Sequence, residues 1–131
     1  MTTPDDRRYS AEHEWAKKDG DEVVVGITDF AQAQLGDVVY VELPRVGDQV
    51  EQMKVMGVIE SVKAASDLYS PVTGEVVAVN EGTVNEPQKV NDSPYDEGWL
   101  IRVRPAHDAE LSALMSAADY DLHVGDRGPE E

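Results

Sequence analysis

The chain has 131 residues, no cysteine, and a formal charge of −16 that comes from 27 acidic and 11 basic residues. This length suits a single domain over residues 1–131, and the lack of cysteine excludes a disulfide framework and thiol chemistry of the protein itself. The acidic balance argues against binding to nucleic acid or to an anionic membrane surface, because both require a basic protein face.

The sequence shows no membrane span and no targeting segment. No apolar run approaches the ~20 residues of a spanning helix. Residues Met1–Asp6 lack the hydrophobic region of a signal peptide and contain acids that a transit peptide avoids. We therefore expect a cytoplasmic protein, or the mature form of an organellar one. Residues 1–8 and 125–131 are polar and are expected to be flexible.

Short valine-rich runs separated by turn residues predict a mainly β fold with small helices. The expected strands lie at residues 23–27, 38–41, from about 50, 55–59, 72–77 and 99–104. Between the first two, Thr28 or Asp29 can cap a short helix over Phe30–Leu35, and Gly36 can end it.

One segment of the chain is echoed later in the sequence. Gly36-Asp37-Val38-Val39-Tyr40-Val41 matches Gly74-Glu75-Val76-Val77-Ala78-Val79, 38 positions further on. Two copies are too few for a solenoid. They indicate a fold built from two similar β-halves packed face to face.

The last third of the chain predicts a strand followed by one helix. In Trp99–Arg104 the arginines alternate toward the solvent face, and Pro105 ends the strand. Asp108 can then cap a helix whose apolar residues recur at helical spacing and face the sheet. These residues are Leu111, Leu114, Met115 and Ala118.

No catalytic motif is found. There is no Gly-x-Ser-x-Gly elbow and no glycine-rich phosphate loop after a strand. His13, His107 and His123 lie far apart in the sequence. In Glu12-His13-Glu14, neighbouring residues on a strand would point to opposite faces, so no metal site is expected. These absences indicate that the chain is a substrate of other enzymes and does not act as an enzyme alone.

Lys63 is presented in a way that a modifying enzyme would need in order to reach it. The apolar runs Val55–Ile59 and Val72–Val77 predict two strands joined by a tight turn that presents this lysine. Its neighbours Ala64, Ala65 and Ser66 are too small to crowd it. From the residues alone, a solvated lysine at a turn is the plain alternative.

Four ordered motifs carry a resemblance to a known family. They are Glu60-Ser61-Val62-Lys63-Ala64-Ala65-Ser66-Asp67-Leu68-Tyr69-Ser70-Pro71, His13-Glu14-Trp15, Gly26-Ile27-Thr28-Asp29-Phe30-Ala31-Gln32, and Leu35-Gly36-Asp37-Val38-Val39. The chain resembles glycine cleavage system H proteins from about Tyr9 to Tyr120. The resemblance implies a lipoyl-domain-like barrel-sandwich hybrid of two quasi-symmetric β-halves, with a C-terminal helix.

The resemblance also implies a carrier function. (R)-lipoate would be attached to Lys63 by a lipoate ligase or a lipoyl transferase. The arm would take the aminomethyl group of glycine from the pyridoxal-phosphate-dependent glycine decarboxylase (P protein) to the aminomethyltransferase (T protein). Dihydrolipoamide dehydrogenase (L protein) would then reoxidise it. The chain itself is expected to be non-catalytic, and monomeric because one arm must reach several large partners.

The family match places Glu14 and Asp67 where the amine of the cargo would dock. Many relatives carry a small hydroxyl residue at position 12, and Glu12 here adds a third carboxylate. From the residues alone, Glu14 would be a solvated strand acid and Asp67 a turn-stabilising residue. Trp15 is expected in the core.

Three other functions compete with this interpretation. An H-like protein could only relay lipoate to other complexes. A biotin carrier could use Lys54, since Met53-Lys54-Val55 is similar to the Met-Lys-Met of biotinyl domains. An acidic adaptor would carry no prosthetic group.

Overall fold

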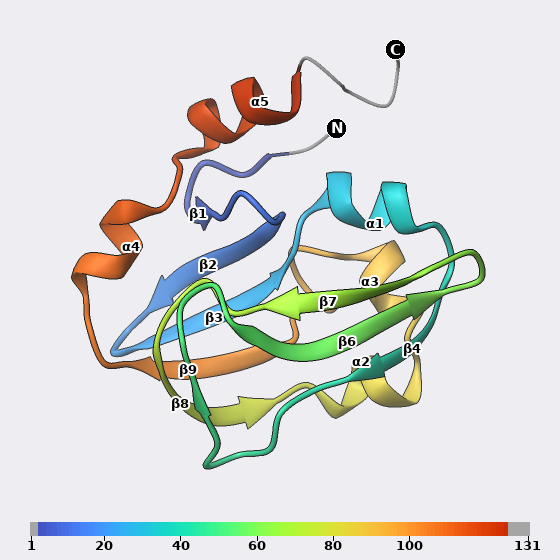
Figure 1. Cartoon of the computed structure of the whole chain (residues 1–131), viewed down its shortest axis with the longest axis horizontal. Helices are drawn as coiled ribbons and strands as arrows, with labels where there is room; N and C mark the ends of the chain where they lie inside the picture. The colour runs from blue at the N-terminus through green and yellow to red at the C-terminus, as the bar shows by residue number, and fades with distance from the viewer. Residues whose placement is uncertain (1–2, 126–131) are drawn as a thin grey trace.

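The computed structural model describes residues 3–125. Two β-sheets form its framework: a six-stranded sheet of order β1-β2-β3-β9-β8-β5 and a three-stranded sheet of order β4-β6-β7 (Figure 1). The strands are β1 (Arg8–Tyr9), β2 (Glu14–Asp19), β3 (Glu22–Ile27), β4 (Val38–Glu42), β5 (Gln49–Val50), β6 (Val55–Ser61), β7 (Ala65–Tyr69), β8 (Gly74–Val79) and β9 (Ile101–Pro105). The helices are α1 (Asp29–Leu35), α2 (Glu81–Asn85), α3 (Lys89–Asp92), α4 (Ala109–Ala113) and α5 (Ala117–Gly125).

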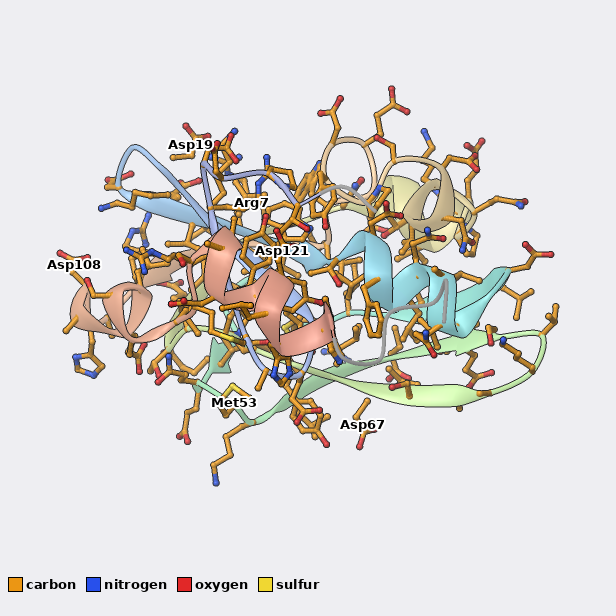
Figure 2. The ribbon with its side chains drawn as sticks, turned by 90° about the horizontal axis from the view of Figure 1, so that it is seen from above. Arg7, Asp19, Met53, Asp67, Asp108 and Asp121 are labelled. Carbon is orange, nitrogen blue, oxygen red and sulfur yellow. The ribbon has the colours of Figure 1, made fainter. Side chains whose placement is uncertain are left out.

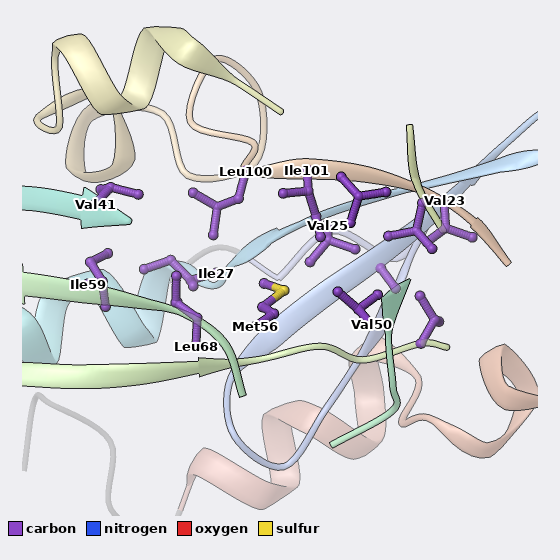
Figure 3. Close-up of a cluster of buried hydrophobic side chains, with 14 of the residues drawn as sticks. Val23, Val25, Ile27, Val41, Val50, Met56, Ile59, Leu68, Leu100 and Ile101 are labelled. Carbon is purple, nitrogen blue, oxygen red and sulfur yellow. The ribbon is translucent and has the colours of Figure 1, made fainter. Parts of the chain in front are cut away.

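The hydrophobic core joins the two sheets (Figure 3). In β3, the alternate residues Val23, Val25 and Ile27 are buried, as the period of two predicts. Ile59 of β6 and Leu68 of β7 contribute from the smaller sheet, and both are buried. Each such side chain stabilises the fold by about 1.5–3 kcal/mol.

The mainly β architecture, with two packed sheets and several short helices, is confirmed. The echoed segments lie in different sheets, the first in β4 and the second in β8. The predicted helix α1 also forms: the Thr28 hydroxyl accepts a hydrogen bond from the Ala31 amide at 3.1 Å, and Gly36 follows the helix with φ of 80°. Gly36 suits this left-handed position because it has no Cβ.

The predicted partner strand of the lysine hairpin is wrong. Glu60 pairs with Ala65 and Ile59 with Ser66, so the hairpin is β6–β7. The valine-rich run at 74–79 instead pairs with β5 and β9 in the other sheet. In β7, Leu68 is buried while Ala65, Ser66 and Asp67 are exposed, and this polar edge strand lacks the apolar signal of a strand.

The expectation of one C-terminal helix from Asp108 is wrong in detail. Met115 pairs with Tyr9 through two backbone hydrogen bonds of 2.9 and 2.8 Å. This pairing needs an extended backbone, and Leu114 has ψ of 164°, so the segment divides into α4 and α5. Asp108 occupies the position before α4 without a capping side-chain hydrogen bond.

The structure describes only part of the two terminal segments that were expected to be flexible. Residues 1, 2 and 126–131 lie outside the described range, and Gly125 is the last residue of α5. Within the described part, the Thr3 hydroxyl donates to Asp121 at 2.6 Å, and Arg8 pairs with Ala16 in β2. Flexibility at both ends stays a prediction.

Gly57→Ala should destabilise the protein by about 1–3 kcal/mol. A Cβ at Gly57 would overlap the backbone carbonyl oxygen of Glu42 in the neighbouring strand β4, so β4 and β6 would have to separate. Urea unfolding measures the change in free energy. Val55→Ala, on an exposed part of the same strand, is the control and should cost less than about 1 kcal/mol. Equal stabilities of the two variants would contradict the close packing.

Candidate functional site

Lys63 lies in the turn of the β6–β7 hairpin, and its side chain is exposed. Ser61 organises this turn: its amide donates to the Ala64 carbonyl at 2.7 Å, and its hydroxyl accepts from the amides of Lys63 and Ala64 at 3.3 and 3.2 Å. The Val62 amide donates to the Asp37 carbonyl at 3.1 Å. The turn is thereby fixed, and it extends past α1 at the right-hand edge of the molecule (Figure 1).

The other candidate lysine, Lys54, is exposed as well and directly precedes β6. Its amide donates to Glu51 at 3.0 Å, and its carbonyl accepts from Ser70 at 3.0 Å. Lys54 is absent from the residues lining the cleft described next. The two lysines therefore differ in their surroundings, although both reach solvent.

A cleft of about 520 Å³ opens beside the lysine hairpin. Its apolar wall comes from α1, β3 and the two hairpin strands: Ile27, Phe30, Ala31, Leu35, Ile59 and Leu68. Its polar lining consists of Glu12, His13, Glu14, Gln34, Ser66 and Asp67. Ala64 and Ala65 also line the cleft, so it begins next to Lys63. The three candidate carboxylates are thus brought together from two distant segments.

Glu14 is the buried carboxylate of this cleft, with only 2% of its surface exposed. The Ser10 hydroxyl donates to its Oε1 at 2.6 Å, and the Tyr69 amide donates to its Oε2 at 3.1 Å. Burial raises the pKa of the Glu14 carboxyl to about 7, although both hydrogen bonds act to lower it. The alternative that Glu14 is a solvated strand acid is wrong.

Glu12 and Asp67 are both exposed at the cleft. Asp67 projects outward beside the hairpin (Figure 2). It lies in β7 opposite Val58, so it is a strand residue and the alternative that it stabilises the turn is wrong. The cleft therefore combines two solvated carboxylates at its mouth with one buried carboxyl.

Several lining residues escaped the sequence prediction. His13 has φ of 76° and lies at the cleft, where its Nδ1 is 2.8 Å from the Tyr120 hydroxyl of α5. The same hydroxyl is 2.8 Å from the Thr28 hydroxyl. The ring centroids of His13 and His123 are 5.8 Å apart. The capping residues predicted α1 but not its place in the cleft wall, and nothing in the sequence joins His13 to α5.

Two further predictions concern the position of Trp15 and the presence of a metal site. Trp15 is 1% exposed and belongs to an aromatic cluster with Tyr9 and Tyr120, so its core position is confirmed. Within residues 3–125, no three His, Cys, Asp or Glu side chains come together in a way that could hold a metal ion. No helix in that range is long and apolar enough to cross a bilayer.

The raised pKa of Glu14 predicts a pH-dependent contribution to stability. A carboxyl whose pKa is about 7 when folded and about 4.5 when unfolded favours folding most below pH 4.5, and this contribution is lost as the pH rises through 7. Glu14→Gln should therefore gain stability relative to the native chain between pH 5 and pH 8, by on the order of 3 kcal/mol.

Urea unfolding at several pH values measures this difference. Glu60→Gln, at an exposed position on the hairpin, is the control and should show a much smaller pH-dependent gain. Parallel stability curves for the native chain and Glu14→Gln would contradict the buried, proton-binding carboxyl.

The glycine cleavage H-protein family model matches residues 7–126. The chain is 52% identical over 124 residues to the glycine cleavage system H protein of Anaeromyxobacter sp. (strain K), covering 95% of this chain and 97% of that one. It is 53% identical over 125 residues to the H protein of Carboxydothermus hydrogenoformans, covering 95% and 96%. The crystal structure of an H protein from Mycobacterium marinum superposes with a TM-score of 0.87 at 40% identity, covering 93% and 98%. The chain belongs to the glycine cleavage H-protein family.

Proposed function

We propose that Lys63 Nζ carries a lipoyl group in amide linkage, and that the chain is the lipoyl carrier of glycine cleavage. The observation that supports this most is the position of Lys63: an exposed lysine in a fixed turn, directly beside an apolar cleft lined by carboxylates. Family membership supports the carrier role.

The cleft residues fit such a group. When attached, the lipoyl group would supply a disulfide able to accept the aminomethyl group as glycine loses carbon dioxide, and a dithiol that can be reoxidised once that group has been passed on. Phe30, Leu35 and Leu68 offer an apolar surface against its hydrocarbon chain. Acylation removes the positive charge of Lys63, so contact with this apolar wall no longer requires desolvation of an ammonium group.

The carboxylates fit an amine-bearing cargo. Asp67 and Glu12 provide negative charge at the mouth of the cleft and favour a cation there. The Glu14 carboxyl, with a pKa of about 7, can hold or release a proton near neutral pH on the inner side of the same cleft.

The reaction steps belong to other enzymes in this proposal. The partners are the P, T and L proteins, together with a lipoate ligase or a lipoyl transferase that modifies Lys63. The formal charge of −16 steers the chain toward basic surfaces on such partners. A tethered arm reaches each partner at an effective concentration on the order of millimolar.

Lys63→Arg should abolish lipoylation and with it glycine cleavage. Arginine keeps the positive charge but lacks the primary amine that forms the amide. The purified chain is incubated with lipoate, ATP and a lipoate ligase, and the intact mass and a peptide digest locate the adduct. Glycine cleavage assayed with the P, T and L proteins should fall to the level found without this chain.

Lys54→Arg is the matched control and should be lipoylated like the native chain. An adduct on Lys63→Arg, a biotinyl adduct at Lys54, or no adduct on the native chain would each contradict the proposal. An adduct at Lys63 without support of glycine cleavage would favour the lipoate-relay alternative.

Asp67→Asn should weaken the retention of an amine-bearing cargo. Loss of the carboxylate charge removes an ion pair at the cleft mouth, which we expect to be worth up to about 1 kcal/mol at this exposed position. In a mixture of lipoylated chain, glycine and P protein without T protein, ammonia release should rise a few-fold. Glu60→Gln, also exposed on the hairpin, is the control. Equal ammonia release from both variants would contradict the docking role of Asp67.

A further inference from the structure

We propose that Asn91 is a positioning residue for the modification of Lys63. This inference rests on the proposed function of Lys63 as the attachment site. Asn91 lies in α3, which packs beside α1 (Figure 1). It is outside the cleft and makes no contact with the lysine among the hydrogen bonds and ion pairs found in residues 3–125.

The Asn91 side chain binds the connection between α1 and β4 at two points, Gly36 and Val38. Its Nδ2 donates to the Gly36 carbonyl at 2.8 Å and to Gln32 Oε1 at 3.0 Å. Its Oδ1 accepts from the Val38 amide at 2.9 Å. Two backbone groups two residues apart are thus bound to a single amide, and Asp37 between them is held in place.

Asp37 and Gly36 are the residues against which the lysine turn rests. The Asp37 carbonyl accepts the Val62 amide at 3.1 Å, directly before Lys63. Gly36 faces the lysine side chain: a Cβ built on Gly36 would lie 3.4 Å from Lys63 Cε. Asn91 therefore acts on Lys63 indirectly, through Gly36 and Asp37, and does not have to contact the lysine itself.

The remainder of α3 has its own attachment to the core. Val90 is completely buried, and the helix backbone is held by bonds such as Asp92 amide to Gln88 carbonyl at 3.0 Å. Removing the Asn91 amide should leave α3 docked and loosen the connection at Gly36 and Asp37, while Val38 stays buried and paired with Ser61. Misplacement of a reacting group by about 1 Å can reduce a rate by about 10²-fold, so we expect a large effect on modification of Lys63.

Asn91→Ala tests the inference, with Asn80→Ala as a matched control. Asn80 is half-buried like Asn91 and also makes three side-chain hydrogen bonds, to Glu97, Trp99 and Gly82. None of these touches the lysine hairpin. Two quantities are measured on folded protein: the kcat/KM of lipoylation by a lipoate ligase, and hydrogen exchange of the Val62 amide by NMR.

In Asn91→Ala, kcat/KM should fall by about 10- to 100-fold and Val62 exchange should accelerate. In Asn80→Ala both should stay near the native values, even where global stability falls by a similar amount. Native lipoylation kinetics in Asn91→Ala, or equal losses in both variants, would overturn the inference. If the native chain is not lipoylated at Lys63, the proposed function fails, and unchanged Val62 exchange in Asn91→Ala would separately refute the positioning role.

Discussion

The buried Glu14 carboxyl connects the two sheets at the place where the cleft opens. Its residue belongs to β2 of the larger sheet, and it accepts the amide of Tyr69 in β7 of the smaller one. The Ser10 hydroxyl satisfies the other oxygen. A buried carboxyl without such partners would be strongly unfavourable. The bond from the Tyr69 amide also joins β2 to β7, and so links the two sheets beside the cleft.

The charge of Lys63 is isolated from the other charges of the hairpin. The chain is strongly acidic, yet Lys63 projects from a turn whose neighbours are small and uncharged. In the described part of the chain it takes part in none of the ion pairs found, in contrast to Arg102, which pairs with Asp19 at 2.6 Å and Glu22 at 2.7 Å. The Lys63 amine is exposed to solvent, and a modification that removed its charge would break none of the ion pairs found.

Much of the fold could be predicted because valine alternation and turn residues carry a strong local signal. The strand over Glu22–Ile27, the Thr28-capped helix and the repeat at 36–41 and 74–79 all follow from such patterns. The strand at Ala65–Tyr69 did not, because an edge strand beside a cleft can be polar on most positions. The break at Met115 did not either, because pairing with Tyr9 overrides helical spacing from more than a hundred residues away.

In the site too, features formed by neighbouring residues could be predicted, and features that depend on distant residues could not. Lys63 could be singled out because the consecutive residues around it carry a family motif, although the strand that follows its turn was predicted in the wrong place. The exposure and burial of the carboxylates could not: Glu12 and Glu14 are two positions apart, but one is solvated and the other has a pKa raised to about 7 by burial. Burial raises the pKa of Glu14 against the lowering effect of the hydrogen bonds from Ser10 and Tyr69, and this burial depends on packing against residues far away in the sequence, such as Tyr69.

The helices added to the two sheets give the cleft its form. α1 supplies Phe30, Ala31 and Leu35 to one wall, and the two-sheet framework alone has no element there. The connection that leaves α1 then turns back along the hairpin, where Asp37 accepts the Val62 amide. One short helix therefore both encloses the space for an arm and anchors the turn that would carry it. Wall and anchor thus belong to one continuous segment of the chain, so the position of α1 bears on both the shape of the cleft and the place of the lysine turn.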